Sequence, residues 1–454
     1  MPKGGRKVFL CTACGWESPQ WFGFCRSCGS QTPLVEAPVP TSTPTPRQGW
    51  VSGGPAPVEL AQVQGDASPR LPLPFPEVNR VLGGGLVLGS ILLVAGEPGM
   101  GKSTLLLQVA HAMAGQGKVA YLSGEESPEQ VLLRARRLGI RGEGIFLLTD
   151  PCIDSLWQHL DALTPSLLIV DSIQTVYTEG VEGTPGSILQ VRECARLLLQ
   201  WGKAHRTPVV LVGHVTKEGE VAGPQVLQHM VDAVLLLEGE RNTPLRILRA
   251  VKNRFGPTDE VAVLEMGPQG LREVPDPSRY LLSGRAPAPG SVVAPLLVGD
   301  RPLLVEVQAL TGPAGNFAPR RDAVGYDERR LRSVAAALAQ RARFPVGDKD
   351  IAVKVVGGIR ADDPAADLAV ALAIASSVRD VPLEPGAVAF GEVGLTGELR
   401  PVPHTRRRLQ ETARLGFTAV ILPLREEEPI PPGLTVYPVG TLRQALEKAL
   451  PQRG

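Results

Sequence analysis

Residues 91–104 have the sequence ILLVAGEPGMGKST, and this stretch decides the fold of the region around it. Its first residues, ILLVA, are all apolar, which is typical of a strand that is buried on both faces. The segment GEPGMGKS matches the pattern G-x4-G-K-[ST], whose glycines let backbone N–H groups surround phosphate oxygens at the start of a helix. A glycine-rich turn can match this pattern by chance, but the strand before it and the amphipathic segment after it favour a phosphate-binding loop. We therefore expect a nucleotide-binding α/β domain.

The residues of this loop have distinct expected roles. Lys102 is expected to reach the β- and γ-phosphates, and the Ser103 hydroxyl is expected to bind Mg²⁺. The expected cofactors are therefore ATP and Mg²⁺. The residues expected to contact the nucleotide are Gly96, Glu97, Pro98, Gly99, Met100, Gly101, Lys102, Ser103 and Thr104.

Short apolar runs alternate with amphipathic segments after this loop. Strand-like runs occupy 119–123, 145–148, 167–171, 209–213 and 233–238, and apolar residues at helical spacing occupy 103–114, 128–138, 153–162 and 188–205. This alternation predicts a parallel sheet that is covered by helices on both sides.

Polar side chains at the ends of these strands are candidates for catalysis. Asp171 ends the run LLIVD, where a carboxylate can bind Mg²⁺ beside the nucleotide. Glu125 and Glu126 follow the strand VAYLS; one can polarise the attacking water, and either can instead cap the next helix. We favour Glu125 as the base. His214 ends another strand, and it either senses the γ-phosphate or is an ordinary hydrogen-bonded histidine.

Four of the six cysteines form two C-x2-C pairs near the N-terminus, Cys11 with Cys14 and Cys25 with Cys28. Four thiolates in this arrangement can close a tetrahedron around Zn²⁺, and the short intervening loop would draw its folding energy from the metal. Disulfides are the less favoured alternative, because we expect a reducing compartment. Aromatic residues beside cations in this segment can stack on single-stranded bases or simply pack around the metal.

Composition divides the chain and limits its possible classes. Its 454 residues carry 47 basic and 46 acidic side chains, a net charge of +1, so a nucleic-acid partner would have to be met by local patches. No apolar run is long enough to span a membrane, and the N-terminus does not resemble a secretion signal, so we expect a cytoplasmic protein. We expect a zinc knuckle at 1–32, a proline-rich linker at 33–57, a P-loop ATPase domain at 58–282 and a second α/β domain at 283–454.

Several longer motifs go beyond a generic P-loop protein. They are GEPGMGKST at 96–104, LLIVDSIQT at 167–175, GHVTKEG at 213–219 and KNRFG at 252–256. Together with the four N-terminal cysteines, they resemble the bacterial RadA (Sms) family of DNA repair and recombination proteins over essentially the whole chain. KNRFG is the most diagnostic of them, since P-loops are widespread.

The resemblance implies a RecA-like, DNA-dependent ATPase of the ring-helicase type. Such a protein forms a hexamer, moves on single-stranded DNA and promotes branch migration of recombination intermediates beside a RecA-type recombinase, in the response to DNA damage stress. Loops 178–187 and 216–225 would face DNA, with Lys217 on phosphate. Lys252 and Arg254 would reach a neighbour's ATP in trans or hold DNA phosphate, unless they belong to a solvated charge run.

The C-terminal domain resembles the Lon protease domain without its catalytic dyad. The place of the nucleophilic serine falls at Ala365, and the place of the lysine falls at about Arg406, so neither a nucleophile nor a base is present. We therefore expect a scaffold for ring assembly with a surface that faces DNA, although solvated helix faces explain such charge runs equally well. Candidate DNA contacts are Arg320, Arg321, Arg329, Arg330, Arg332, Arg406, Arg407 and Arg408.

Two other functions compete with the DNA motor. One is a nucleotide-gated adaptor that loads other proteins without moving on DNA. The other is an ATP-dependent protease, which the missing dyad disfavours.

Overall fold

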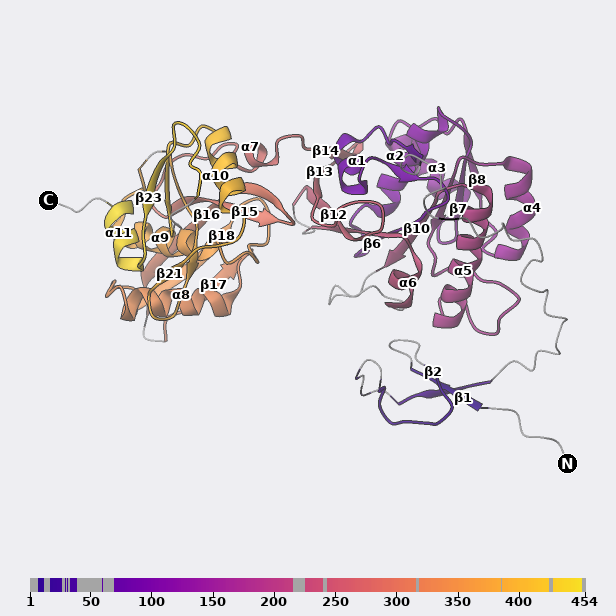
Figure 1. Cartoon of the computed structure of the whole chain (residues 1–454), viewed down its shortest axis with the longest axis horizontal. Coiled ribbons are helices and arrows are strands. Elements are labelled where there is room, and N and C mark those ends of the chain that lie inside the picture. Colours follow the sequence, from indigo (N-terminus) through magenta and orange to yellow (C-terminus); the bar gives the residue numbers. More distant parts are fainter. Residues whose placement is uncertain are drawn as a thin grey trace. The chain divides into compact units, whose positions relative to one another are not determined.

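The computed structural model describes most of the chain as two compact units (Figure 1). The first unit comprises residues 1–238, 247–258 and 266–272, and the second comprises 239–246, 259–265 and 273–454. Cys14, Cys28 and Lys217 lie outside the described residues. The described residues are 7–11, 17–26, 29, 31, 33–38, 59, 69–214, 225–239, 243–315, 318–384, 386–423 and 428–450.

A small sheet lies near the N-terminus. Strand β1 (Lys7–Leu10) pairs in antiparallel fashion with β2 (Glu17–Ser18) and with β3 (Val35–Pro38). Strand β3 therefore falls within the segment 33–57 that composition assigns to a linker. Cys11 and Cys25, one from each cysteine pair, are both buried in a cluster with Leu34.

The main sheet has the order β14-β13-β12-β11-β6-β10-β9-β7-β8. Its strands from β11 to β8 run parallel to their neighbours, as the alternating pattern predicts, whereas β12 joins β11 in antiparallel fashion. The α/β prediction for this region is confirmed. The strands are β6 (Ile91–Gly96), β7 (Val119–Ser123), β8 (Ile145–Leu148), β9 (Leu167–Asp171), β10 (Val209–His214), β11 (Ala233–Glu238), β12 (Leu245–Asn253), β13 (Val261–Gly267) and β14 (Gly270–Glu273).

Helices α4, α5 and α6 pack with the parallel strands in one apolar core, and Figure 1 shows the helices of this unit around its sheet. They are α1 (Pro76–Leu82), α2 (Lys102–Ala114), α3 (Pro128–Arg137), α4 (Ile153–Leu163), α5 (Ile188–His205) and α6 (Gln225–Met230); a short ribbon of β4 (Arg70–Leu71) and β5 (Leu86–Val87) flanks α1. Helix α3 begins with a capping box in which the Ser127 hydroxyl accepts from the backbone N–H of Gln130. The cap is thus Ser127, so neither Glu125 nor Glu126 provides it.

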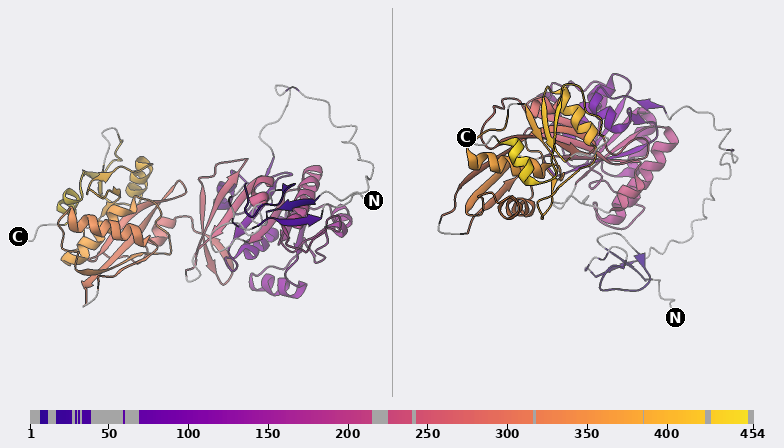
Figure 2. Two further views of the ribbon diagram at one scale, coloured as in Figure 1. Left: turned by 90° about the horizontal axis from the view of Figure 1, so that it is seen from below. Right: turned by 60° about the vertical axis from the view of Figure 1, so that its left-hand side comes forward.

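The second unit contains a mixed seven-stranded sheet with the order β17-β18-β16-β15-β19-β22-β23 (Figure 2). Helix α9 consists largely of small and aliphatic residues, is buried along most of its length, and packs on β15 and β16. The strands are β15 (Ser291–Val298), β16 (Arg301–Pro313), β17 (Arg321–Val324), β18 (Lys349–Val355), β19 (Ala387–Ala389), β22 (Ala419–Leu422) and β23 (Thr435–Pro438), with β20 (Glu392–Val393) and β21 (Leu399–Arg400) as a separate pair. The helices are α7 (Pro277–Leu281), α8 (Glu328–Gln340), α9 (Ala366–Arg379), α10 (Thr405–Arg414) and α11 (Leu442–Ala449).

Helices of membrane-spanning length and hydrophobicity are not found in the part of the chain that the structure describes.

Candidate nucleotide-binding and hydrolysis site

The phosphate-binding loop joins the end of β6 to the start of α2. Gly99 and Gly101 have φ angles of 85° and 104°, which lie in the left-handed region that favours glycine. A Cβ atom on Gly101 would also collide with the Met266 methyl group, and one on Gly96 would collide with the Leu237 carbonyl oxygen. The glycines that the motif requires are therefore required by the fold of this loop as well.

Lys102 lies at the first position of α2 with its side chain folded back over the loop. Its Nζ donates to the carbonyl oxygens of Gly96 (2.8 Å) and Glu97 (3.0 Å), and the residue is only 5% exposed. Burial lowers the pKa of Lys102, and the carboxylates of Asp171 and Glu125 partly oppose this shift. No acidic residue lies in the first turn of α2, so the positive end of the helix dipole is left for an anion. These features fit the triphosphate of a nucleotide.

Asp171 ends β9 beside the strand β7. The Tyr121 hydroxyl of β7 donates a hydrogen bond of 2.7 Å to Asp171 Oδ2. Burial raises the pKa of Tyr121 well above its usual value, and Asp171 raises it further, so the phenol keeps its proton and remains a donor. Tyr121 therefore fixes the orientation of a carboxylate at the edge of the sheet where the phosphate-binding loop lies.

Glu125 is held in place by two other elements. Ser172 donates a hydrogen bond of 2.6 Å from its hydroxyl to Glu125 Oε1, and His214 Nε2 lies 3.1 Å from the same oxygen. Partial burial disfavours the charge of Glu125, but the hydrogen bonds from Ser172 and His214 outweigh it and lower the pKa below the usual value. Glu126 points elsewhere and forms an ion pair with Arg134 of α3.

His214 links this carboxylate to the centre of the sheet. It is the last residue of β10 and pairs in register with Gly96, the first glycine of the loop. Its Nδ1 atom is buried and has no hydrogen-bond partner among the described residues. His214 is thus next to the nucleotide site, and its contact there is with Glu125.

The KNRFG motif lies at the end of β12, and its two cations point to different places. Lys252 Nζ donates to three carbonyl oxygens at the end of α6, those of Gln228 (2.6 Å), Val231 (2.7 Å) and His229 (3.3 Å). The Arg254 side chain remains 53% exposed while it contacts Asp232 at 3.3 Å.

The rest of this motif is packed into the turn that follows α1. Asn253 Nδ2 donates to the Val81 carbonyl oxygen at 3.3 Å, and Arg70 donates to the Phe255 carbonyl oxygen at 2.6 Å. Gly256 lies so close to Gly83 that a Cβ atom on Gly83 would be 3.1 Å from the Gly256 Cα atom. Asn253, Phe255 and Gly256 therefore hold the turn, and only Arg254 presents a side chain outward.

The second unit places a buried ion pair at the segment that resembles the protease nucleophile motif. Arg408, not Arg406, is the cation that reaches this segment: its NH1 atom lies 2.6 Å from Asp363 Oδ2, and the residue is 0% exposed. Asp363 Oδ1 accepts from the backbone N–H of Ala365 at 3.0 Å. Helix α10 turns Arg408 inward and leaves Arg406, the expected place of the lysine, exposed. Full burial also removes Arg408 from the candidate DNA contacts.

The other candidate arginines of this unit differ in their exposure and in the hydrogen bonds and ion pairs that they form within the chain. Arg330 donates to the carbonyl oxygens of 361–363 and pairs with Asp367, and the Arg321 guanidinium donates to the carbonyls of Arg320, Val346 and Lys349. Arg407 pairs with Asp300 at 3.0 Å. Arg320 is exposed.

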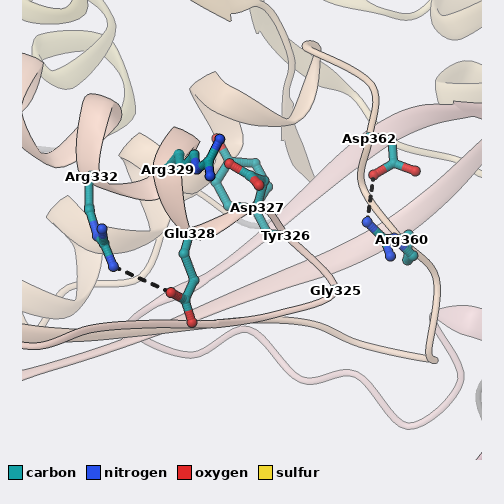
Figure 3. A pocket seen from close by; sticks show the side chains of 8 residues that line it. All are labelled: Gly325, Tyr326, Asp327, Glu328, Arg329, Arg332, Arg360 and Asp362. Carbon is teal, nitrogen blue, oxygen red and sulfur yellow. Dashed lines mark hydrogen bonds and ion pairs between the residues drawn. The ribbon is translucent and has the colours of Figure 1, made fainter. Parts of the chain in front are cut away.

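Two more of these arginines line a pocket of about 430 Å³ at the start of α8 (Figure 3). Arg332 lies 3.4 Å from Glu328, and a further cation, Arg360, lies 3.5 Å from Asp362. Three cations and three anions line this pocket, so its charge is balanced. The lining residues are Gly325, Tyr326, Asp327, Glu328, Arg329, Arg332, Arg360 and Asp362.

Comparison with known proteins identifies relatives along the whole chain. It is 43% identical to the DNA repair protein RadA of Bacillus subtilis strain 168, over 98% of this chain and 99% of that protein. The proteins of the same name from Aquifex aeolicus and Pseudomonas aeruginosa are also 43% identical, over 97% of this chain and 98% of each relative. Two family models match parts of it: an AAA domain at residues 56–220 and the subunit ChlI of Mg-chelatase at residues 321–426. A solved KaiC-like protein from Pyrococcus horikoshii covers 46% of this chain and all of its own, at 17% identity and a TM-score of 0.39.

Proposed function

Because the chain belongs to the RadA family of DNA repair proteins, we propose that it is an ATP-driven motor that moves on single-stranded DNA and promotes branch migration of recombination intermediates. The observation that carries this proposal is the convergence of Lys102, Asp171 and Glu125 at one edge of the parallel sheet. Hydrolysis of ATP at this edge would drive the movement.

The residues at this edge of the sheet would each have a separate role in ATP hydrolysis. Lys102 binds the β- and γ-phosphates, and the Ser103 hydroxyl and Asp171 would hold Mg²⁺, which when bound neutralises charge on the phosphates. Tyr121 keeps Asp171 in position through its hydrogen bond. Glu125, whose pKa is lowered, is ionised at neutral pH and orients the attacking water. It would accept the water's proton as the water oxygen bonds to the γ-phosphorus and the bond from that phosphorus to the leaving ADP breaks.

Assembly into a ring brings a second set of residues to the nucleotide. We assign the role in trans to Arg254, whose side chain is exposed, and we assign to Lys252 the fixing of α6 in its own subunit. The ring would be a homo-hexamer, acting beside a RecA-type recombinase in the cytoplasm. DNA would run past loops 178–187 and 216–225, where Lys217 would contact phosphate. It would also run past the exposed Arg320 and the partly exposed Arg321 of the C-terminal domain at 283–454.

Exchange of the two neighbouring glutamates tests both the motor and its base. We expect Glu125→Gln to lower DNA-stimulated ATP hydrolysis by about 10²-fold or more, because the amide cannot accept a proton. Strand displacement on a tailed duplex should fall with it. Glu126→Gln is the matched control and should keep both activities, since Glu126 pairs with Arg134 on α3.

The outcomes of this assay separate the candidate functions. Wild-type protein that hydrolyses ATP with DNA yet displaces no strand would be a nucleotide-gated adaptor and not a motor. If Glu126→Gln were the inactive variant, Glu125 would not be the base.

For the N-terminal segment 1–32, we propose a structural zinc site formed by Cys11, Cys14, Cys25 and Cys28. Its support is the shared burial of Cys11 and Cys25 in a cluster that contains few apolar residues, so a metal would supply much of the folding energy. We expect about one zinc ion per chain by metal analysis, and its loss from the double variant Cys11→Ser, Cys14→Ser. Zinc content that is unchanged in that variant would rule the site out; Cys152→Ser is the control, because Cys152 lies in the ATPase core.

A further inference from the structure

Loop 178–187, between β9 and α5, has an unusual charge for a segment that faces DNA. Its sequence, TEGVEGTPGS, contains two glutamates and neither lysine nor arginine. Attraction of DNA phosphates by charge therefore cannot come from this loop. If it contacts the strand, as the proposed function requires, the contact must use uncharged donors, which are the backbone N–H groups and the threonine and serine hydroxyls. Backbone N–H groups bind phosphate only when the backbone holds a defined shape.

One buried side chain from α5 holds that shape. Gln190 is 2% exposed, and its Oε1 atom accepts from the backbone N–H of Thr178 at 2.9 Å. Its Nε2 atom donates to the carbonyl oxygens of Thr178 at 3.0 Å and Val181 at 2.6 Å, with a longer contact of 3.4 Å to Gly183. A single amide thus joins three residues of the loop to the helix that follows it.

A second side chain, from α4, holds the start of the same loop. Asp154 Oδ2 accepts from the Thr178 hydroxyl at 2.9 Å and from the backbone N–H of Glu179 at 2.8 Å. Beyond these residues the loop emerges into solvent, with 182–185 exposed. The fixed base and exposed tip are what a backbone-mediated contact needs.

The fixed base also connects to the hydrolysis site. Ser172 donates to Glu125, and from Ser172 to Thr178 the chain runs through the buried residues Ile173 and Val176. Only a short buried segment therefore separates the proposed base from the point that Gln190 holds.

We propose that Gln190, aided by Asp154, is a positioning residue for single-stranded DNA: it fixes the backbone of loop 178–187 in the shape that binds phosphate. This inference rests on the proposed function, because it requires that the loop faces DNA. Because the Gln190 side chain is uncharged and buried, a search for basic residues would not identify this role in DNA binding.

The test uses full-length Gln190→Met, which keeps the length of the side chain and removes its hydrogen bonds. The DNA concentration that gives half-maximal stimulation of ATP hydrolysis should rise about tenfold, since several buried hydrogen bonds are lost. The rate at saturating DNA should stay within about twofold, and the slope of DNA affinity against salt should not change, because no phosphate-bound cation has been removed. Gln200→Met, at an exposed position of the same helix, is the matched control and should behave as wild type.

Each outcome bears on a different statement. If wild-type protein shows no stimulation by DNA, the proposed function fails. If the wild type is stimulated but Gln190→Met has the wild-type DNA dependence, the inference is overturned. The inference is also overturned if Gln190→Met lowers both the rate of ATP hydrolysis at saturating DNA and the thermal stability. Gln190 would then have a structural role only. Should Gln190→Met not fold, Thr178→Val removes the hydroxyl that donates to Asp154 and accepts from the backbone N–H of Gly180. An unaltered DNA dependence in that variant would equally count against the proposal.

Discussion

Replacement of Lys102 by alanine is expected to lower ATP hydrolysis by roughly 10²–10³-fold or more, because it removes the cation that meets charge developing on the transferred phosphate. In the protein, the Lys102 ammonium is already confined between loop carbonyls and faces the carboxylates of Asp171 and Glu125. Steady-state ATPase assays with and without single-stranded DNA measure the loss.

The control for this variant is Lys118→Ala, because Lys118 is exposed on the turn before β7. The Lys102→Ala protein should still assemble as wild type does, as judged by its mass in solution, since the lysine lies within the loop of its own subunit. Retained DNA-stimulated turnover in Lys102→Ala would overturn the assignment of this loop as the hydrolysis site.

Removal of Asp363 is expected to destabilise the second unit by about 3–5 kcal/mol, because it leaves the buried Arg408 charge without its partner. Asp363 Oδ2 also accepts from the backbone N–H of Leu297 at 2.8 Å, so Asp363→Ala breaks contacts to both α10 and β15. Amide hydrogen exchange in the full-length protein measures the stability of α9 and α10 separately from that of the ATPase core.

A neighbouring residue provides a stringent control for this prediction. Asp362 is adjacent in sequence, but its side chain is 77% exposed and its pair with Arg360 is 3.5 Å long, so Asp362→Ala should change stability by less than about 1 kcal/mol. Replacement of both members of the buried pair, as in Asp363→Leu, Arg408→Met, should recover much of the loss. Equal effects of Asp362→Ala and Asp363→Ala would show that burial of the pair is not what matters.

Features that depend on a short stretch of sequence were predictable. The loop at 96–103 can be recognised because its glycines, lysine and serine lie within one short segment. The parallel strands can be recognised from their apolar runs. Asp171 was predictable for the same reason, since it directly follows a buried strand. Local patterns therefore gave the α/β core.

Features that depend on which elements become neighbours were not predictable. The hydrogen bond from Tyr121 to Asp171 requires β7 and β9 to be adjacent, and sequence does not give the order of strands. The sequence signal for Tyr121 is a phenol group in the middle of a mostly aliphatic strand, which must find a hydrogen-bond partner when buried. The sequence favours Glu125 over Glu126, but the hydrogen bonds that hold Glu125 depend on where Ser172 and His214 lie.

The position of each arginine around helix α10 explains why only one of three consecutive arginines is buried. Arg406, Arg407 and Arg408 are equivalent as a charge run, yet only Arg408 faces inward because consecutive residues on a helix point about 100° apart. Sequence identifies the run, whereas the packing of α10 selects its buried member.

In the ring that we propose, the position of Lys252 would affect how subunit association and DNA binding influence each other. A lysine that is bound by three carbonyl groups of its own chain is not available to a neighbouring subunit, so any contact it makes across an interface requires α6 to release it first. Helix α6 directly follows residues 215–224, which contain Lys217. Because coupling between two equilibria is reciprocal, a ligand that favours release of this lysine for such a contact would strengthen subunit association by the same factor by which association would strengthen that ligand's binding.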